Sequence, residues 1–281
     1  MKFICPEMQA DTISEKLDEY LKIDIPFENQ HKLNHFLLSI IDHTSLEGTD
    51  NEKKIQDLCH QALDIKNKTR NQSTVAAVCV YPVFAETAKR ELLNSGIQIA
   101  CVAGAFPSGQ SPMHLRVEEA SYAVANGASE IDMVISRGQM LDGNYRHIYH
   151  EVHEIKKAIG NTHLKVILET GELQEINIIR RAAEIAIQAG ADFIKTSTGK
   201  VKPAATLEAF LAMLDVIKTY YYQENRKIGI KPAGGISDPE TAKDYIRVLY
   251  GHLGKDWLNK NLFRIGASRL TTKVVDELST H

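Results

Sequence analysis

Short apolar runs alternate with longer amphipathic segments along almost the whole chain, and this alternation limits the possible folds more than any other feature. Runs rich in β-branched and other apolar residues predict strands. The predicted strands cover residues 35–42, 74–82, 97–106, 130–136, 163–170, 192–199, 227–235 and 262–268.

The segments between these runs have the spacing of helices. Residues 51–68, 143–160, 173–190 and 205–222 repeat apolar side chains three and four positions apart. Several such segments end in a glycine just before the next strand, where helices commonly stop. Eight strand and helix units in 281 residues predict an α/β protein with a (β/α)8 TIM barrel.

An open, doubly wound sheet would share the same alternation. It is disfavoured because no GxGxxG motif follows the first predicted strand and because the polar candidates lie at the ends of several strands. No linker rich in Gly, Ser or Pro divides the chain. We therefore expect one barrel domain over residues 1–281, in which residues 1–30 form a short N-terminal helical extension.

Composition and charge exclude several classes of partner. A net charge of -3 provides no general attraction to nucleic acid or to an anionic membrane. No run approaches the roughly 18 apolar residues of a membrane span, and the first residues do not resemble a signal peptide. The cysteines lack CxxC spacing, which favours reduced thiols and a cytoplasmic location. They are Cys5, Cys59, Cys79 and Cys101.

Three ionisable residues interrupt strands that are otherwise apolar. Asp132 lies in "EIDMV", Lys195 in "FIKTS" and Lys231 in "GIKPAGG". A lone lysine in this setting would extend its ammonium group to the barrel rim. Three charged groups at similar depth favour a shared site instead, because burying each one separately costs several kcal/mol.

Such a set of residues suits catalysis by an amine. An ordinary lysine is protonated at neutral pH and attacks a carbonyl only when burial or a nearby cation destabilises its ammonium form. Lowering the pKa of Lys195 by about three units requires about 4 kcal/mol, which burial together with Lys231 can supply. Asp132 would balance the two cations and help to move protons.

Small residues follow the last three predicted strands. Gly199 and Lys200 end "TSTGK", Gly234 and Gly235 belong to "KPAGGIS", and "RIGAS" closes the last strand. A single glycine would simply end a strand, but three such loops leave backbone N–H groups accessible to an anion. Loops after the late strands of a barrel commonly bind phosphate.

These motifs together resemble a known family. The series "AAVCVYP", "EIDMVI", "LKVILETGEL", "GADFIKTSTGK", "GIKPAGGIS" and "FRIGAS" is similar to that of the deoxyribose-phosphate aldolases, which are class I aldolases, over about residues 35–270. The resemblance implies a barrel that cleaves 2-deoxy-D-ribose 5-phosphate to D-glyceraldehyde 3-phosphate and acetaldehyde. It implies no cofactor and no metal, and a homodimer is expected from the resemblance alone.

Carried over position by position, the resemblance assigns roles to individual residues. Lys195 corresponds to the Schiff-base lysine, Lys231 to the residue that lowers its pKa, and Asp132 to the partner in proton transfer. Asp42 and Thr198 match positions that contact sugar hydroxyls. The phosphate positions are Gly199, Lys200, Gly234, Gly235, Gly266 and Ser268. The chain departs from the family pattern at Arg269, which would contact phosphate or face solvent, and it lacks a C-terminal tyrosine.

Three other functions stay open at this point. The chain could be another lysine-dependent barrel aldolase or transaldolase, or a phosphosugar sensor without catalysis, although a sensor has no need of two adjacent cations. Metal-dependent aldolase chemistry would need histidine ligands. His147, His150 and His153 are instead expected on an exposed helix face, because Ile148 and Val152 occupy the opposite one.

Overall fold

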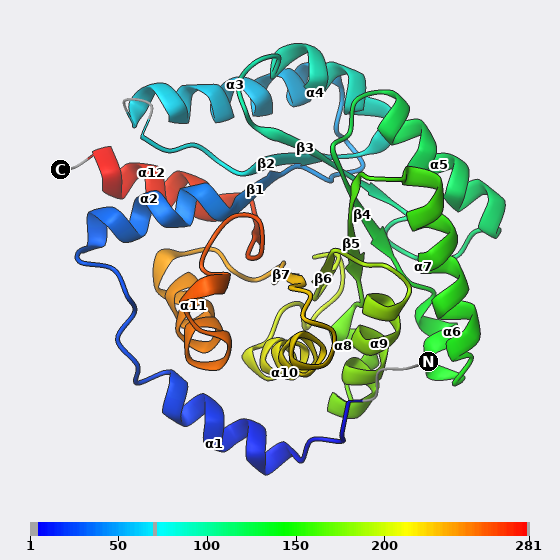
Figure 1. Ribbon diagram of the computed structural model, residues 1–281. Helices are drawn as coiled ribbons and strands as arrows, with labels where there is room; N and C mark the ends of the chain where they lie inside the picture. The colour runs from blue at the N-terminus through cyan, green and yellow to red at the C-terminus, as the bar shows by residue number, and fades with distance from the viewer. Residues whose placement is uncertain (1–4, 70–71, 280–281) are drawn as a thin grey trace.

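The computed structural model describes residues 5–69 and 72–279, and its parallel strands form a barrel with helices outside it (Figure 1). Strands β1 to β7 pair in parallel in sequence order, and β1 also pairs in parallel with β8. The strands are β1 (Ile41–Thr44), β2 (Ala77–Val80), β3 (Gln98–Ala103), β4 (Glu130–Val134), β5 (His163–Ile167), β6 (Phe193–Lys195), β7 (Gly229–Lys231) and β8 (Ile265–Ala267). The predicted TIM barrel is confirmed.

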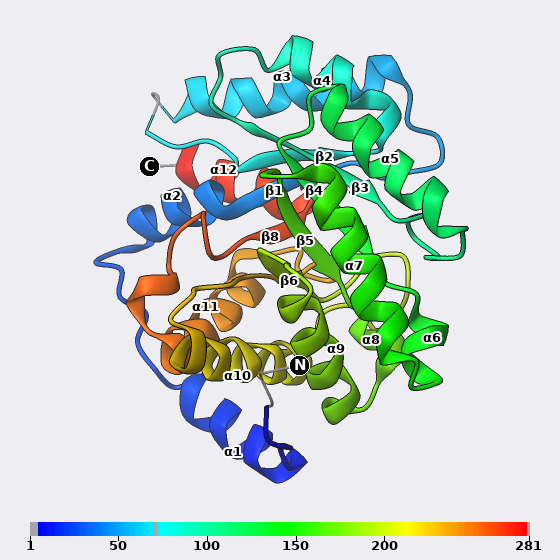
Figure 2. The same ribbon diagram turned by 45° about the vertical axis from the view of Figure 1, so that its right-hand side comes forward.

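Helices connect the strands and cover the outside of the barrel (Figures 1 and 2). The helices are α1 (Ala10–Tyr20), α2 (Gln30–Ile40), α3 (Glu52–Lys68), α4 (Ala85–Glu91), α5 (Met113–Ala125), α6 (Arg137–Leu141), α7 (Tyr145–Ile159), α8 (Thr170–Leu173), α9 (Ile176–Gln188), α10 (Leu207–Glu224), α11 (Pro239–Leu253) and α12 (Arg269–Ser279), with short 3-10 turns at Pro82–Phe84 and Lys255–Trp257. Within the described residues, no helix is long and apolar enough to cross a membrane.

The first predicted strand was wrong for most of its length. Residues 35–40 belong to helix α2, and β1 begins only at Ile41. The Asn29 side chain accepts a hydrogen bond from the backbone N–H of Lys32 at 2.9 Å and caps this helix. Leu33 and Leu37, four positions apart, are buried on one helix face. An apolar run of this length does not by itself distinguish a buried helix from a strand.

The remaining seven strands lie inside their predicted ranges, but the barrel closes less regularly between β7 and β8. In the described part of the chain, two isolated bridges join these strands and their flanking residues, Ile230 with Phe263 and Ala233 with Gly266. Backbone hydrogen bonds support the junction, including Arg264 N–H to Ile230 O at 3.1 Å and Gly266 N–H to Pro232 O at 3.0 Å. This junction brings the end of β8 beside the loop that follows β7.

Side chains alternate between the inside of the barrel and the helix layer, as the two-residue period of a strand requires. Ile131 and Met133 of β4 point outward into the large apolar core, as do Ile194 of β6 and Ile230 of β7. The residues between them therefore face the barrel interior. This parity turns Asp132, Lys195 and Lys231 toward one another.

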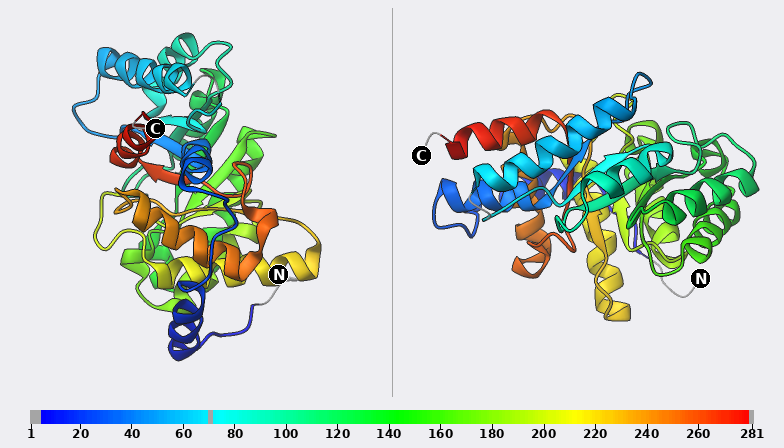
Figure 3. Two further views of the ribbon diagram at one scale, coloured as in Figure 1. Left: turned by 90° about the vertical axis from the view of Figure 1, so that its left-hand side faces the viewer. Right: turned by 90° about the horizontal axis from the view of Figure 1, so that it is seen from above.

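The N-terminal extension lies outside the ring of helices. Helix α1 packs against α10 and α11, as Figure 1 and the left view of Figure 3 show. A Cβ atom on Gly251 of α11 would come within 2.5 Å of the Tyr20 ring, so the glycine makes room for α1. Before α1, the Met8 N–H donates to Asn177 Oδ1 at 3.0 Å, and Arg180 donates to the Pro6 carbonyl at 2.6 Å.

Candidate active site

The three predicted catalytic residues meet inside the barrel. Lys195 and Lys231 are directly paired in the register of β6 and β7, and Asp132 projects from β4. One carboxylate oxygen, Asp132 Oδ2, accepts hydrogen bonds from Lys195 Nζ at 2.8 Å and from Lys231 Nζ at 2.6 Å. All three side chains are buried, and Lys195 is only 3% exposed.

The pKa values of the two lysines shift in opposite directions although both amines contact this oxygen. Burial lowers the pKa of Lys195, and the adjacent Lys231 ammonium lowers it further, although Asp132 opposes the change. Burial also works against the ammonium form of Lys231, but Asp132 and Asp42 outweigh it and raise the pKa of that group. Lys195 is therefore the amine closer to its neutral, nucleophilic form.

Three further charged residues complete the site, and sequence reasoning missed all of them. Lys165 of β5 donates to Glu130 Oε2 at 2.5 Å and to Asp132 Oδ1 at 2.8 Å. Arg264, just before β8, donates to Asp42 Oδ1 at 2.6 Å and to Glu130 Oε1 at 2.8 Å. The two-residue period of a strand could have identified Glu130 from the sequence. Glu130 lies two residues before Asp132 and therefore shares its inward face.

Asp42 lies in this ionic cluster instead of in an open pocket. Its Oδ2 accepts from Lys231 Nζ at 2.5 Å, and its Oδ1 is held by Arg264. Burial opposes ionisation, but Lys231 and Arg264 together hold the pKa of Asp42 below its usual value. The proposed contact of Asp42 with a sugar hydroxyl stays a prediction.

The other side of the barrel interior is apolar and has mostly small side chains. The thiol of Cys79 is buried here, and the charges of Lys231, Asp132 and Lys195 all act on it. This wall therefore stands next to the amine pair. It consists of Leu46, Ala77, Cys79, Ala100 and Val102, with Tyr81 and Phe106 packed against it.

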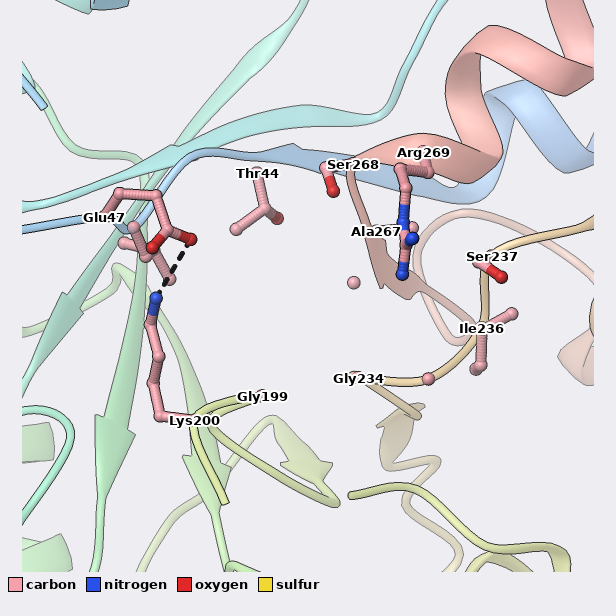
Figure 4. A pocket seen from close by; sticks show the side chains of 13 residues that line it. Thr44, Glu47, Gly199, Lys200, Gly234, Ile236, Ser237, Ala267, Ser268 and Arg269 are labelled. Carbon is pink, nitrogen blue, oxygen red and sulfur yellow. Dashed lines mark hydrogen bonds and ion pairs between the residues drawn. The ribbon is translucent and has the colours of Figure 1, made fainter. Parts of the chain in front are cut away.

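A pocket of about 160 Å³ opens at the carboxyl ends of β6, β7, β8 and β1 (Figure 4). All six predicted phosphate residues line it, namely Gly199, Lys200, Gly234, Gly235, Gly266 and Ser268. Lys200 lies on one side, where its Nζ contacts Glu47 Oε1 at 3.0 Å. Arg269, whose position the sequence left open, lines the opposite side at the start of α12.

Two glycines are needed where this pocket meets the ionic cluster. Gly234 has a φ of +80°, and a Cβ atom there would come within 2.6 Å of Ala204 Cβ. A Cβ on Gly266 would lie 2.8 Å from Ala233 Cβ and 3.2 Å from Lys231 Cε. Gly266 thus lines the pocket and leaves space for the Lys231 side chain, which links the two parts of the site.

Thr198 has a different environment from the one predicted. Its hydroxyl donates to Glu169 Oε2, its backbone N–H contacts the same carboxylate at 3.3 Å, and the residue is buried. Its Oγ1 accepts from the Lys200 N–H at 3.0 Å. Thr198 thus shapes the turn at Gly199 and Lys200, whereas its contact with a sugar hydroxyl stays untested. Glu169, which sequence reasoning overlooked, has a left-handed φ of 58°.

The histidines of α7 lie where the sequence predicted. His150 and His153 are exposed, while Ile148, Val152, Ile155 and Ile159 are buried on the opposite face. His147 lies near Glu151, with Nε2 3.6 Å from Oε2. The four cysteines are free thiols. Cys79 packs in the apolar wall.

Comparison with known proteins agrees with this geometry. The model of the DeoC/LacD family aldolases matches residues 36–251. Deoxyribose-phosphate aldolase of Homo sapiens is 40% identical over 254 residues, which cover 87% of this chain and 80% of the human protein.

Solved structures share the same architecture. A candidate deoxyribose-phosphate aldolase from Toxoplasma gondii ME49 superposes with a TM-score of 0.80 at 26% identity, covering 89% of this chain and 95% of that chain. The aldolase QR15 superposes with a TM-score of 0.71 at 30% identity, covering 86% of this chain and 95% of that chain. With Asp132, Lys195 and Lys231 inside the matched region, the chain belongs to the DeoC/LacD family of aldolases.

Proposed function

We propose that this chain is a class I aldolase that reversibly cleaves 2-deoxy-D-ribose 5-phosphate to D-glyceraldehyde 3-phosphate and acetaldehyde. One observation supports it above all: Lys195, whose pKa burial lowers, shares a carboxylate oxygen with Lys231, and Gly266, which leaves space for Lys231, lines a pocket suited to phosphate. Family membership and the names of the relatives support the same substrate.

In the cleavage direction, the neutral amine of Lys195 attacks C1 of the open-chain sugar, and loss of water gives an iminium ion. The iminium withdraws electrons, so the C3 hydroxyl loses its proton and the bond between C2 and C3 breaks. This bond must be the one cleaved, because the products contain two and three carbons. D-glyceraldehyde 3-phosphate leaves, and a two-carbon enamine stays on Lys195.

Protonation of the enamine at C2 restores an iminium, and water then releases acetaldehyde and the free amine. We assign the proton transfers to Asp132, because it is the carboxylate bonded to both Lys195 and Lys231. Lys231 stays positively charged through the cycle, since Asp132 and Asp42 outweigh burial and raise its pKa. Its charge keeps Lys195 available as a free amine between turnovers.

Shape and charge suit a two-carbon donor and a phosphorylated acceptor. The apolar wall around Cys79 suits contact with a methyl group and provides no charged partner for a larger polar donor. At the pocket, Lys200, Arg269 and the N-terminus of α12 supply positive charge and N–H donors for a phosphate. Phosphate binding far from the reacting bond would hold C1 against Lys195.

Trapping of the intermediate tests the reaction class. The protein is incubated with acetaldehyde and borohydride, and the added mass is located by peptide mapping. We expect an ethyl group on Lys195. A folded protein without this adduct would contradict the amine mechanism. A preference for dihydroxyacetone or a ketose phosphate over acetaldehyde as donor would point to another lysine-dependent aldolase or a transaldolase.

The phosphate site makes a separate prediction. Lys200→Met should raise KM for the phosphorylated sugar about tenfold, because a charged contact contributes on the order of 1.5 kcal/mol. The kcat/KM for unphosphorylated 2-deoxyribose should stay nearly unchanged. Steady-state kinetics with both sugars separates the two effects. An equal loss with both substrates would show that Lys200 acts on the reacting groups instead of on phosphate.

Location and assembly complete the proposal. Four free cysteines suit a reducing, cytoplasmic compartment. The net charge of -3 suits a protein without a nucleic-acid partner. We also propose one domain with an N-terminal extension, supported by the packing of α1 on α10 and α11. A homodimer is proposed on the family resemblance alone, and size-exclusion chromatography with light scattering tests it.

A further inference from the structure

We propose that the buried pair Arg264 and Glu130 is a positioning element that determines which amine of the site is neutral, and that it selects Lys195. This inference deepens the proposed function and rests on it. Neither residue was a candidate in the sequence, and the chemical steps above use neither of them. The argument comes from the contacts and the charge balance of the cluster.

Arg264 is connected to Lys195 only through intermediate groups. It binds Asp42 Oδ1 at 2.6 Å, and the other oxygen of Asp42 binds Lys231 at 2.5 Å. Lys231 shares Asp132 Oδ2 with Lys195. On its other side, Arg264 binds Glu130, which in turn binds Lys165 Nζ at 2.5 Å. A change of charge at Arg264 or Glu130 is therefore transmitted through buried ion pairs.

The cluster contains one more basic group than acidic groups. Its basic members are Lys165, Lys195, Lys231 and Arg264, and its carboxylates are Asp42, Glu130 and Asp132, all buried. An uncompensated charge in a buried site is costly. Loss of one proton from a basic group balances the cluster, so the composition of the site favours one neutral amine.

The contacts decide which group loses that proton. Arginine does not lose its proton in proteins. Lys165 has carboxylate oxygens of Glu130 and Asp132 at 2.5 and 2.8 Å, with Asp42 at 3.8 Å. Lys231 has two carboxylate contacts, with Asp42 and Asp132.

Lys195 has a single carboxylate contact, with Asp132 of β4. The other charged or titratable groups that act on it are Lys231 of β7 and Cys79 of β2. Burial raises the pKa of the Cys79 thiol, so this group stays neutral. Lys195 is thus the lysine with the fewest carboxylate contacts, and it is the group that loses the surplus proton.

Arg264 is essential to this balance because its charge is permanent. Without it, three ammonium groups would face three carboxylates, no proton would be in surplus, and Lys195 would stay protonated to higher pH. Without the charge of Glu130, four basic groups would face two carboxylates, and Lys195 would lose its proton at lower pH. Removing both charges would restore a surplus of one.

The experiment measures how the rate of borohydride trapping at Lys195 and kcat/KM depend on pH. Arg264→Met should move the acidic limb of both profiles upward by about one pH unit, which lowers the rate about tenfold on that limb. Glu130→Gln should move it downward. In the double variant, which carries both substitutions, the acidic limb should lie close to its pH in the unmodified protein. Arg226→Met, which removes a half-exposed cation bonded to Asp192, is the matched control and should not move it.

The outcomes separate this inference from the function on which it rests. No adduct in the unmodified protein overturns both. Two results would overturn only the inference. In the first, folded Arg264→Met forms the adduct but its acidic limb lies at the same pH as in the unmodified protein. In the second, the acidic limb shifts in the same direction in both single variants. If Arg264→Met does not fold, Glu130→Gln decides the question alone, because loss of packing does not predict a downward shift. Circular dichroism and thermal unfolding report whether each variant is folded.

Discussion

Replacement of Lys195 by methionine should abolish both the borohydride adduct and the aldolase activity. Methionine fills a similar volume but has no amine, so no iminium forms and the electron sink is lost. We expect kcat/KM to fall by about four orders of magnitude or more, as when a covalent nucleophile is removed from other enzymes. A coupled assay for D-glyceraldehyde 3-phosphate measures the fall, and intact-protein mass spectrometry measures the adduct.

The control is Lys157→Met on the exposed side of α7, which should keep full activity. A Lys195→Met protein that still forms an ethyl adduct at another lysine, with activity near that of the unmodified protein, would contradict the assignment. Lys231 would then be the first residue to test, because its Nζ shares Asp132 Oδ2 with Lys195.

Substitution of Asp132 by asparagine should cause the largest loss of stability. One carboxylate contacts three buried lysine amines, of which Lys165 and Lys231 are charged, at 2.8 Å to Lys165, 2.8 Å to Lys195 and 2.6 Å to Lys231. A neutral amide leaves these charges without their shared partner. Breaking a buried ion pair costs about 3–5 kcal/mol. We therefore expect a decrease of that size in the free energy of unfolding, measured by urea denaturation at pH 7.

The matched control is Asp57→Asn. Asp57 also contacts a lysine, Lys53, at 2.6 Å, but on the surface of α3. We expect this change to cost less than about 1 kcal/mol. If both variants lost the same free energy of unfolding, burial of Asp132 would not increase its contribution to stability.

The stability effect at Asp132 should also depend on pH. Burial raises the pKa of this carboxyl, but Lys165, Lys195 and Lys231 outweigh it and hold the pKa well below the usual value. The carboxylate therefore stabilises the folded protein fully above about pH 4, and this contribution is lost as the pH falls toward the pKa of the folded state. The difference between the unmodified protein and Asp132→Asn should shrink accordingly in acid.

Local patterns were enough to predict most of the barrel and part of the site. Seven strands lie within their predicted ranges, because each is a short apolar run bounded by polar or glycine-containing turns. Local cues did not suffice at α2. Its apolar residues read as a strand, but the Asn29 cap and packing against α12 and α11 make residues 30–40 helical.

Strand period and turn chemistry are local properties, so the order of the amino acids was enough to predict charged residues within apolar strands and glycines after the last three strands. The pairing of these charges depends on contacts between distant parts of the chain. Lys165, Glu130 and Arg264 come from different strands or strand ends, and their contacts depend on register and on closure between β7 and β8. In the same way, Thr198 is bonded to Glu169, 29 positions away. A buried charge acquires its role from its neighbours in space, and the barrel brings those neighbours together.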